Sequence, residues 1–309
     1  NLENGLKMIN ISFEKNPDLY KDYETCLKFL RTVDEGAYEY PKDKVKFHVY
    51  TEIKTPKELM VIKSFLATQN LDHCEMIVWS DYNIEDNSLI QPYKDLVTFK
   101  VYDAEKEAIG TPLEGDLKLK MKDSKYYLQS DLARLLLLCK YGGVWADMDI
   151  IFLRDFKPLL EQEYMYMWGS ETNFAVDGAC ATVLSLNKES ELSLELLKEL
   201  MVTSPRPGTT CWGKDMFANL YRRYPFPVLP STFFNTEWCV NIKYGPGANR
   251  KMNESWFEDT GAQDNFLFTE AFTWHWHNSS HKDKPVQPGS KFDLLEKRMD
   301  KVLKEKGFC

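Results

Sequence analysis

Apolar residues in the first third of the chain alternate between the period of two that is typical of a strand and the period of 3.6 that is typical of a helix. The segment VKFHVYTE, which begins at Val45, has the β-branched and aromatic residues of a strand. TPKELMVIKSFLATQN then has helical spacing, with Thr55 as N-cap, Pro56 in the first turn and Glu58 at the capping-box position. Two further runs, CEMIVWSD and DLVTFKVYD, predict strands. This order predicts a parallel sheet with right-handed crossovers, preceded by a helix over residues 17–32.

A long helix is predicted for DSKYYLQSDLARLLLLCKYGG, residues 123–143, with Asp123 or Ser124 as cap and Gly142 or Gly143 as its end. Its second half is apolar nearly all round and is expected to be buried. The polar groups form one stripe, made of Tyr127, Ser130, Asp131 and Arg134. Two interpretations remain open: a patch directed into a functional site, or an Asp131–Arg134 ion pair on a solvated edge.

Two aspartates follow the short predicted strand VWA. Asp147 and Asp149 lie at the carboxyl end of that strand, where open α/β sheets bind ligands. Strand alternation predicts both carboxylates on one side, with Met148 facing away. Such a pair can hold a hard divalent cation that carries a phosphate, and without a cation the two charges should repel each other. A lone D-x-D is weak evidence, because about one match is expected by chance.

Composition narrows the possible partners. The 309 residues are 43% hydrophobic, enough for one large α/β domain or two small ones. A net charge of -8 argues against nucleic acid as the main partner. The run LARLLLLC is too short for a membrane span, so membrane attachment is expected only through a segment absent from this chain, whose start at Asn1 suggests a processed or cut end. The seven cysteines have no zinc-type spacing, and their pairing stays open.

Three N-x-S sequons, at Asn10, Asn253 and Asn278, bear on location. About two matches are expected by chance in a chain of this size, so they favour a secretory compartment only slightly. The expected location is the Golgi lumen if the chain is secretory and eukaryotic, and the cytoplasm otherwise.

The segment SDLARLLLLCKYGGVWADMD resembles the SDxxR…YGGxYxDxD segment of the DXD-motif sugar-nucleotide glycosyltransferases. This group, similar to glycosyltransferase family 32, contains α-1,4-galactosyltransferases, α-1,4-N-acetylglucosaminyltransferases and the yeast initiating mannosyltransferases. VDGACATVLSLNKES, CWGKDMF, VLPSTFFNTEW and TWHWHN resemble further family segments. The resemblance implies a GT-A fold: an α/β, Rossmann-like, mixed but mainly parallel sheet flanked by helices in a single catalytic domain. We expect an N-terminal helical extension at 1–44, the catalytic domain at 45–285 and a C-terminal amphipathic helix at 286–309.

The resemblance also implies a metal site for Mn²⁺ or Mg²⁺. Asp149 would bind the metal directly, and Asp147 would touch it, the ribose or a metal-bound water. His275 matches the His of the family's HxW element and would be a late metal or phosphate ligand. His277 replaces the family's Trp and is the rival for that role. Alternatively, both histidines lie in a surface loop beside Trp274 and Trp276.

The donor would be a UDP-sugar held by residues from several segments. Asp131 and Arg134 would hold the sugar and diphosphate, with Tyr127 on the same side. Tyr50 and Thr51 would meet the uracil and ribose, and Trp79 and Ser80 could line the same pocket, although both aromatic residues fit equally well in the core.

The implied transfer retains the anomeric configuration and needs no strong protein base. Asp177 and Asp215 are the candidates for a polar catalytic group near C1, with Trp212 and Gly213 near the acceptor, a glycan or glycoconjugate hydroxyl. UDP-galactose, UDP-N-acetylglucosamine and UDP-xylose stay open as donors, ahead of GDP-mannose. The oligomeric state and the linkage stay open as well.

Two other functions are compatible with parts of this sequence. A phosphatase of the haloacid-dehalogenase type also has D-x-D, but it needs a long apolar strand before the first Asp and Thr or Val where this chain has Ile151. A non-catalytic sugar-nucleotide or glycan-binding module of the same fold is the alternative to an enzyme. The intact set of Asp131, Arg134, Asp147 and Asp149 favours the enzyme.

Overall fold

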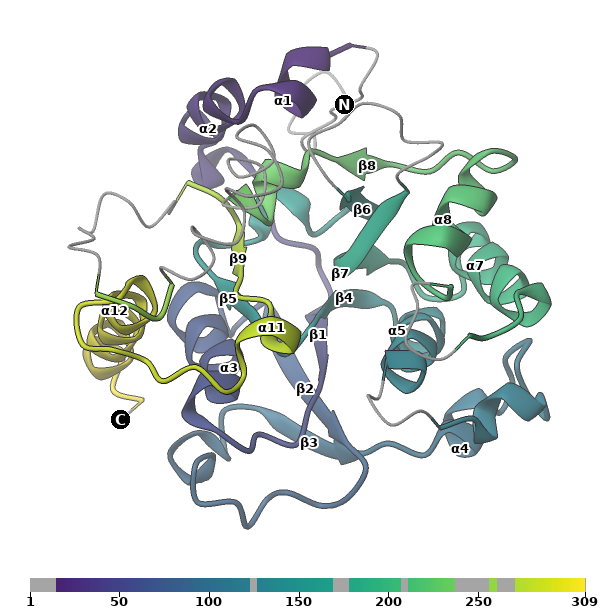
Figure 1. The fold of residues 1–309 in the computed structure, drawn as a ribbon, viewed down its shortest axis with the longest axis horizontal. Coiled ribbons are helices and arrows are strands. Elements are labelled where there is room, and N and C mark those ends of the chain that lie inside the picture. Colours follow the sequence, from purple (N-terminus) through teal and green to yellow (C-terminus); the bar gives the residue numbers. More distant parts are fainter. Residues whose placement is uncertain are drawn as a thin grey trace.

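The computed structural model describes residues 15–122, 127–168, 178–206, 211–236, 256–259 and 270–308. Within them, seven strands form the central sheet in the order β3-β2-β1-β4-β7-β6-β8 (Figure 1). Neighbours are parallel except at β4–β7 and β7–β6. The predicted α/β class with a mixed, mainly parallel sheet is confirmed. The strands are β1 Val45–Tyr50, β2 Cys74–Ser80, β3 Thr98–Val101, β4 Gly143–Ala146, β6 Tyr164–Met167, β7 Ala179–Leu186 and β8 Val228–Leu229.

The first crossover follows the sequence prediction. Helix α3 (Pro56–Thr68) begins where the Thr55 side chain accepts a hydrogen bond from the Glu58 backbone N–H, at 3.4 Å. It returns the chain to β2, which pairs with β1 in parallel along its length. Helix α3 is buried on several sides because two elements pack against it: the C-terminal helix α12 (Lys291–Glu305) and strand β5 (Ile150–Phe152).

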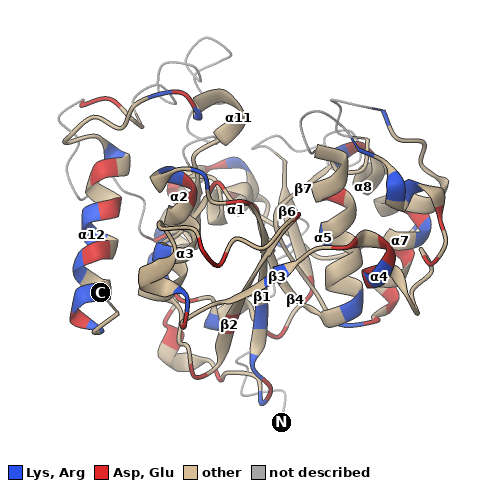
Figure 2. Cartoon of the chain, turned by 90° about the horizontal axis from the view of Figure 1, so that it is seen from below, with Lys and Arg blue, Asp and Glu red and all other residues tan. Residues whose placement is uncertain are grey.

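Helices cover both faces of the sheet, and each face has its own apolar core. In Figure 1, α3 and α12 lie on one side, and α5 (Tyr127–Tyr141), α7 (Glu191–Val202) and α8 (Lys214–Tyr221) lie on the other. Seen from below, α12 carries alternating acidic and basic residues along its length (Figure 2). Among the described residues, no helix has the length and apolar character needed to cross a bilayer.

The region after β4 differs from the prediction. Residues 147–149 do not continue the strand, because the chain turns there and the Ile150 N–H donates to the Asp147 carbonyl at 3.1 Å. Strand alternation therefore does not set the directions of the two carboxylates, although they still lie close enough for the Asp149 charge to raise the pKa of Asp147. After the turn, β5 leaves the main sheet and pairs antiparallel with β9 (Thr273–His275), with Ile150 opposite His275. This small second sheet was not predicted.

The leading helix also differs, because it is broken into α1 (Pro17–Lys21) and α2 (Tyr23–Arg31). Asp22 between them is extended, with φ −119° and ψ 106°, and its side chain caps α2 by accepting from the Glu24 N–H at 3.1 Å. A capping aspartate thus competes successfully with helix continuation. The remaining elements are α4 Ala104–Ala108, α11 Asn278–His281, and the 3₁₀ turns η2 Glu35–Ala37, η3 Gln91–Tyr93, η4 Leu117–Lys120, η5 Lys157–Leu159 and η6 Ser231–Phe233.

Candidate active site

The carboxyl ends of β1, β2 and β4 meet at one edge of the sheet, because these strands are parallel and in register. The antiparallel strand β7 begins at the same edge. Asp147 follows β4 directly, and its backbone N–H donates to the Thr182 carbonyl of β7 at 2.8 Å. Asp147, the first aspartate of the motif, therefore lies at the end of β4 beside the start of β7.

Arg134 of α5 reaches this edge and links two carboxylates. Its Nη2 donates to Asp147 Oδ1 at 2.8 Å, and its Nη1 lies 3.1 Å from Asp131 Oδ1. The guanidinium is 6% exposed and lies 5.5 Å from the Trp145 ring, and the Trp145 Nε1–H also donates to Asp147 Oδ1, at 2.6 Å. The predicted Asp131–Arg134 pair exists, but it is buried at the end of β4 and not on a solvated edge. The role of the stripe in a functional site stays a prediction.

Asp149 forms a second cluster with the C-terminal part of the chain. Its Oδ2 lies 3.0 Å from His275 Nε2 and accepts the Asn278 backbone N–H at 2.8 Å. Burial alone would raise the pKa of Asp149, but the His275 charge and these hydrogen bonds outweigh it and hold the pKa at about 2. Burial likewise opposes the charged form of His275, but Asp149 raises its pKa. The expected repulsion between the two aspartates is present at Asp147, while at Asp149 it is outweighed by the His275 charge and the hydrogen bonds.

The two aspartates differ in their electrostatics. Burial raises the pKa of Asp147, the Arg134 charge opposes this, and the Asp149 carboxylate adds to the rise. Asp149 is thus the fully ionised member of the motif, while Asp147 has its charge shared with Arg134.

The two histidines lie close together. Their ring centroids are 3.8 Å apart, and His275 is in β9 while His277 follows it with a left-handed φ of 56°. Strand alternation directs Trp274 and Trp276 into the core, where they are 0% and 1% exposed. The His275 side chain is only 13% exposed, so the surface-loop alternative was wrong for it. Burial first, and then the His275 charge, lower the pKa of His277 well below its ordinary value.

Asp149 and His275 have side chains of types that bind divalent cations. In this structure Asp149 Oδ2 and His275 Nε2 are hydrogen-bonded to each other at 3.0 Å, so Nε2 carries the proton. A cation held by both would replace this hydrogen bond. The described residues contain no group of three or more His, Cys, Asp or Glu that could hold a metal unaided. Completing the shell would therefore need Asp147, solvent or substrate oxygens.

The ends of β1 and β2, where the sequence predicts contacts to the uracil and ribose, form another part of the same edge. The Thr51 N–H donates to the Trp79 carbonyl at 2.8 Å, and the Ser80 hydroxyl donates to the Tyr82 carbonyl at 2.7 Å. The Tyr50 hydroxyl donates to Asp81. Trp79 is 1% exposed and its indole lies in the core below the edge. Just beyond these strand ends is a pocket of about 410 Å³, lined by segments 52–54 and 82–89.

The remaining predicted residues are more dispersed. Asp215 is in the first turn of α8, with Arg206 Nη2 3.9 Å away. That helix end lies against the start of β7, since a Cβ added to Gly178 would come within 2.5 Å of the Lys214 carbonyl. Tyr127 is 39% exposed at the start of α5. Asp177 lies outside the described residues.

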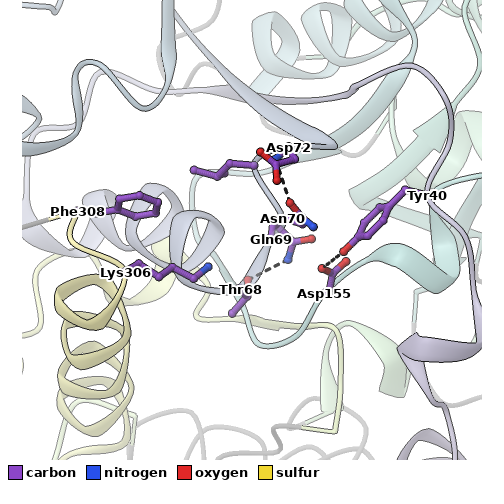
Figure 3. A pocket seen from close by; sticks show the side chains of 9 residues that line it. Tyr40, Thr68, Gln69, Asn70, Asp72, Asp155, Lys306 and Phe308 are labelled. Atoms are coloured by element: carbon purple, nitrogen blue, oxygen red, sulfur yellow. Dashed lines mark hydrogen bonds between the residues drawn. The ribbon is translucent and has the colours of Figure 1, made fainter.

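A second pocket, of about 440 Å³, lies at the opposite end of the sheet from the aspartates, around the segment that leads into β2 (Figure 3). Its polar groups satisfy one another: the Tyr40 hydroxyl donates to Asp155 Oδ2, and Lys306 Nζ donates to the Leu66 carbonyl at 3.0 Å. It shares no residue with the aspartate clusters. The pocket is lined by Tyr40, Thr68, Gln69, Asn70, Leu71, Asp72, Asp155, Lys306 and Phe308.

Two contacts of the site were not anticipated. Trp145 lies two residues before Asp147, and the period of two along a strand was the signal that could have assigned it to the same side. The Asn278 backbone N–H had no sequence signal, because its place beside Asp149 depends on the pairing of β5 with β9.

A known protein family matches the part of the chain that contains both aspartates. Residues 56–166 match the family described as "Glycosyltransferase sugar-binding region containing DXD motif". The match confirms the resemblance predicted from the SDLARLLLLCKYGGVWADMD segment, and it includes Asp131, Arg134, Asp147 and Asp149. Residues 56–166 are thus similar to the DXD-containing sugar-binding region of glycosyltransferases.

Other similarities are more distant. Uncharacterized protein At4g19900 of Arabidopsis thaliana is 25% identical over 305 residues, and the match covers 91% of this chain but only 45% of that protein. The chain thus spans less than half the length of this relative. Among solved structures, apo GlyE of Streptococcus pneumoniae is 13% identical with a TM-score of 0.49, covering 86% of this chain and 63% of GlyE. An active-site mutant of LgtC is 12% identical with a TM-score of 0.47, and the match covers 82% of this chain and 95% of LgtC. Mouse xyloside xylosyltransferase 1 is 13% identical with a TM-score of 0.44, and the match covers 76% of this chain and 98% of that enzyme.

Proposed function

We propose that this protein is a metal-dependent, retaining glycosyltransferase that transfers a hexose or pentose from a UDP-sugar to a hydroxyl of a glycan or glycoconjugate. One observation carries the proposal: at one sheet edge, in a segment that matches a glycosyltransferase family, Arg134 is held between the Asp131 and Asp147 carboxylates. Asp149, hydrogen-bonded to His275, adds a pair of side chains of metal-binding types. Because the chain has a net charge of -8, a bound diphosphate needs local positive charge, which a cation and an arginine can supply.

The nucleoside and the diphosphate of the donor would bind at two different parts of the sheet edge. The pocket of about 410 Å³ beyond β1 and β2 is large enough for a nucleoside. The diphosphate would then extend towards Arg134, whose buried Nε has no hydrogen-bond partner among the described residues. Asp147, which shares its Oδ1 with Arg134 and Trp145, holds the guanidinium in a fixed orientation.

A bound Mn²⁺ or Mg²⁺ would neutralise charge that develops on the leaving diphosphate. Asp149 and His275 are the residues that would hold it, with Asp147 next to them. Asp149 is already ionised, so metal binding at neutral pH displaces no proton from it, whereas His275 would have to release the Nε2 proton that it donates to Asp149.

The proposed transfer breaks the bond between C1 of the donor sugar and the phosphate oxygen, and forms a bond from C1 to the acceptor oxygen. The acceptor's proton moves to the departing phosphate oxygen, on the same face of the sugar, so the anomeric configuration is retained. Arg134 stabilises the departing diphosphate by a charge-assisted contact. Asp215 and Asp177 stay the candidates for a polar group near C1.

The test is turnover of a panel of nucleotide sugars. UDP-galactose, UDP-N-acetylglucosamine, UDP-xylose and GDP-mannose are incubated with Mn²⁺, with Mg²⁺ and with excess chelator, and release of the nucleotide is measured. We expect release from a UDP-sugar with Mn²⁺ and none in chelator, and an α-linked product from an α-linked donor by NMR. Full activity in chelator would contradict the metal requirement. Tight UDP binding without any turnover would favour the non-catalytic binding module instead.

A further inference from the structure

A buried histidine joins the first strand to the glycine turn that precedes the aspartate motif. His48 of β1 is 0% exposed. Its Nε2 lies 3.0 Å from the Gly142 carbonyl oxygen, and its Nδ1 lies 3.1 Å from Trp79 Nε1. An indole nitrogen can only donate, so Nδ1 must accept and Nε2–H must donate to Gly142. Both ring nitrogens are therefore used, and the tautomer is fixed.

The turn that His48 holds allows almost no freedom. Gly142 ends α5 with φ +68°, and its N–H donates to the Leu138 carbonyl at 2.8 Å. Gly143 has φ +109° and passes so close to β1 that an added Cβ would lie 2.1 Å from the Lys46 carbonyl. Gly142 is buried, so without His48 its carbonyl would have to find another partner away from water.

This turn connects the element that carries Arg134 to the element that carries Asp147, so it determines how the two side chains meet. Arg134 lies before it on α5, and Asp147 lies after it at the end of β4, a strand of four residues. His48 is also the residue opposite Trp145 in the β1–β4 register, and Trp145 donates to Asp147. A shift of the turn would therefore move Asp147 relative to Arg134.

We infer that His48 is a positioning residue: by its bond to Gly142 it fixes the turn between α5 and β4, and so fixes Asp147 against the Arg134 fork. Its consequence for donor binding rests on the proposed function, whereas its effect on the turn does not. The groups around the ring are consistent with a neutral imidazole, because Lys46 and Lys100 are the nearby charges and Tyr141 stacks on it at 6.1 Å.

The experiment compares four variants of the whole chain. His48→Phe removes both hydrogen bonds, and His48→Gln keeps a donor and an acceptor. Trp79→Phe removes the indole donor together with part of the buried ring. Leu303→Ala, in the core on the α12 side, is a control for lost stability without contact to the turn. Amide exchange of residues 142–147, the affinity for UDP with Mn²⁺, and thermal unfolding are measured for each.

We expect His48→Phe to speed exchange in residues 142–147 and to weaken UDP binding about tenfold, with His48→Gln close to the original protein. Leu303→Ala should melt lower but keep both properties. If the original protein does not bind UDP, the proposed function fails while the exchange result still tests the turn. A His48→Phe variant that only melts lower, with unchanged exchange and UDP affinity, would overturn the inference.

Discussion

Replacing Asp149 by Asn separates its structural role from its proposed metal role. The variant keeps the shape but removes the charge that His275 and the Asn278 N–H stabilise. Charge-assisted hydrogen bonds are roughly twice as strong as neutral ones. A pKa of about 2, against an ordinary 3.8, corresponds to about 2 kcal/mol of stability at neutral pH. Because the pKa is lowered by folding, this contribution is present above about pH 4 and is lost as the pH falls through about 2.

Without metal, Asp149→Asn should therefore melt lower by about 3 °C in a chain of this size. In the original protein, Mn²⁺ should raise the melting temperature, since it binds only the folded state. That rise should disappear in the variant, and sugar transfer should fall at least ~100-fold, or about 3 kcal/mol of transition-state stabilisation.

The matched control is Asp155→Asn, a partly buried carboxylate in the pocket at the other end of the sheet, hydrogen-bonded to the Tyr40 hydroxyl and the Lys157 N–H. It should leave the Mn²⁺ response and the transfer rate unchanged. Calorimetry with and without Mn²⁺, together with turnover, distinguishes the outcomes. If Asp149→Asn melts lower but still responds to Mn²⁺ and transfers sugar, Asp149 only anchors His275 and the metal assignment is refuted.

Three further changes test other parts of the structure. Arg134→Lys keeps the charge but loses the two-pronged contact, so UDP affinity measured by calorimetry should fall about tenfold; unchanged affinity would contradict a donor role. Burial lowers the pKa of His48 to about 4, so folding excludes its proton: stability is full above about pH 6.5 and declines as the pH falls towards 4. Urea unfolding at pH 4.5 should show about 2 kcal/mol of this loss, and His48→Gln should not show it. Gly143→Ala should cost more than about 3 kcal/mol in urea unfolding, whereas Gly115→Ala, where φ is also positive but no atom lies within 4 Å of the added Cβ, should cost much less.

The parts of the fold that sequence reasoning could predict are those determined by neighbouring residues. The N-cap of α3, the glycine end of α5 and the parallel strands all depend on periods and caps within about fifteen residues. The prediction over residues 17–32 failed at Asp22, because an aspartate is compatible with both a helix interior and a cap, and only packing decides between them.

The candidate site shows the same limit. The stripe with Asp131 and Arg134 could be read from helical spacing, but its burial could not, since it depends on Asp147 meeting the guanidinium. The turn at 147–149 could not be predicted, because it leads the chain into a second sheet whose partner strand is more than a hundred residues away. A local period contains no information about such a pairing.

The pairing of β5 with β9 affects the order in which the contacts of the candidate site form as the chain folds. Arg134 and Asp147 are separated by 13 positions, so their contact can form as soon as α5 and β4 fold. Asp149 and His275 are separated by 126 positions, and their contact requires closing a loop that contains most of the second half of the chain. During synthesis, the arginine side of the edge can therefore assemble early, while the Asp149–His275 pair waits until the residues around 275 have left the ribosome. A partly made chain would have the arginine and the motif but not the histidine, so we expect no metal-dependent activity before the residues around 275 have been made.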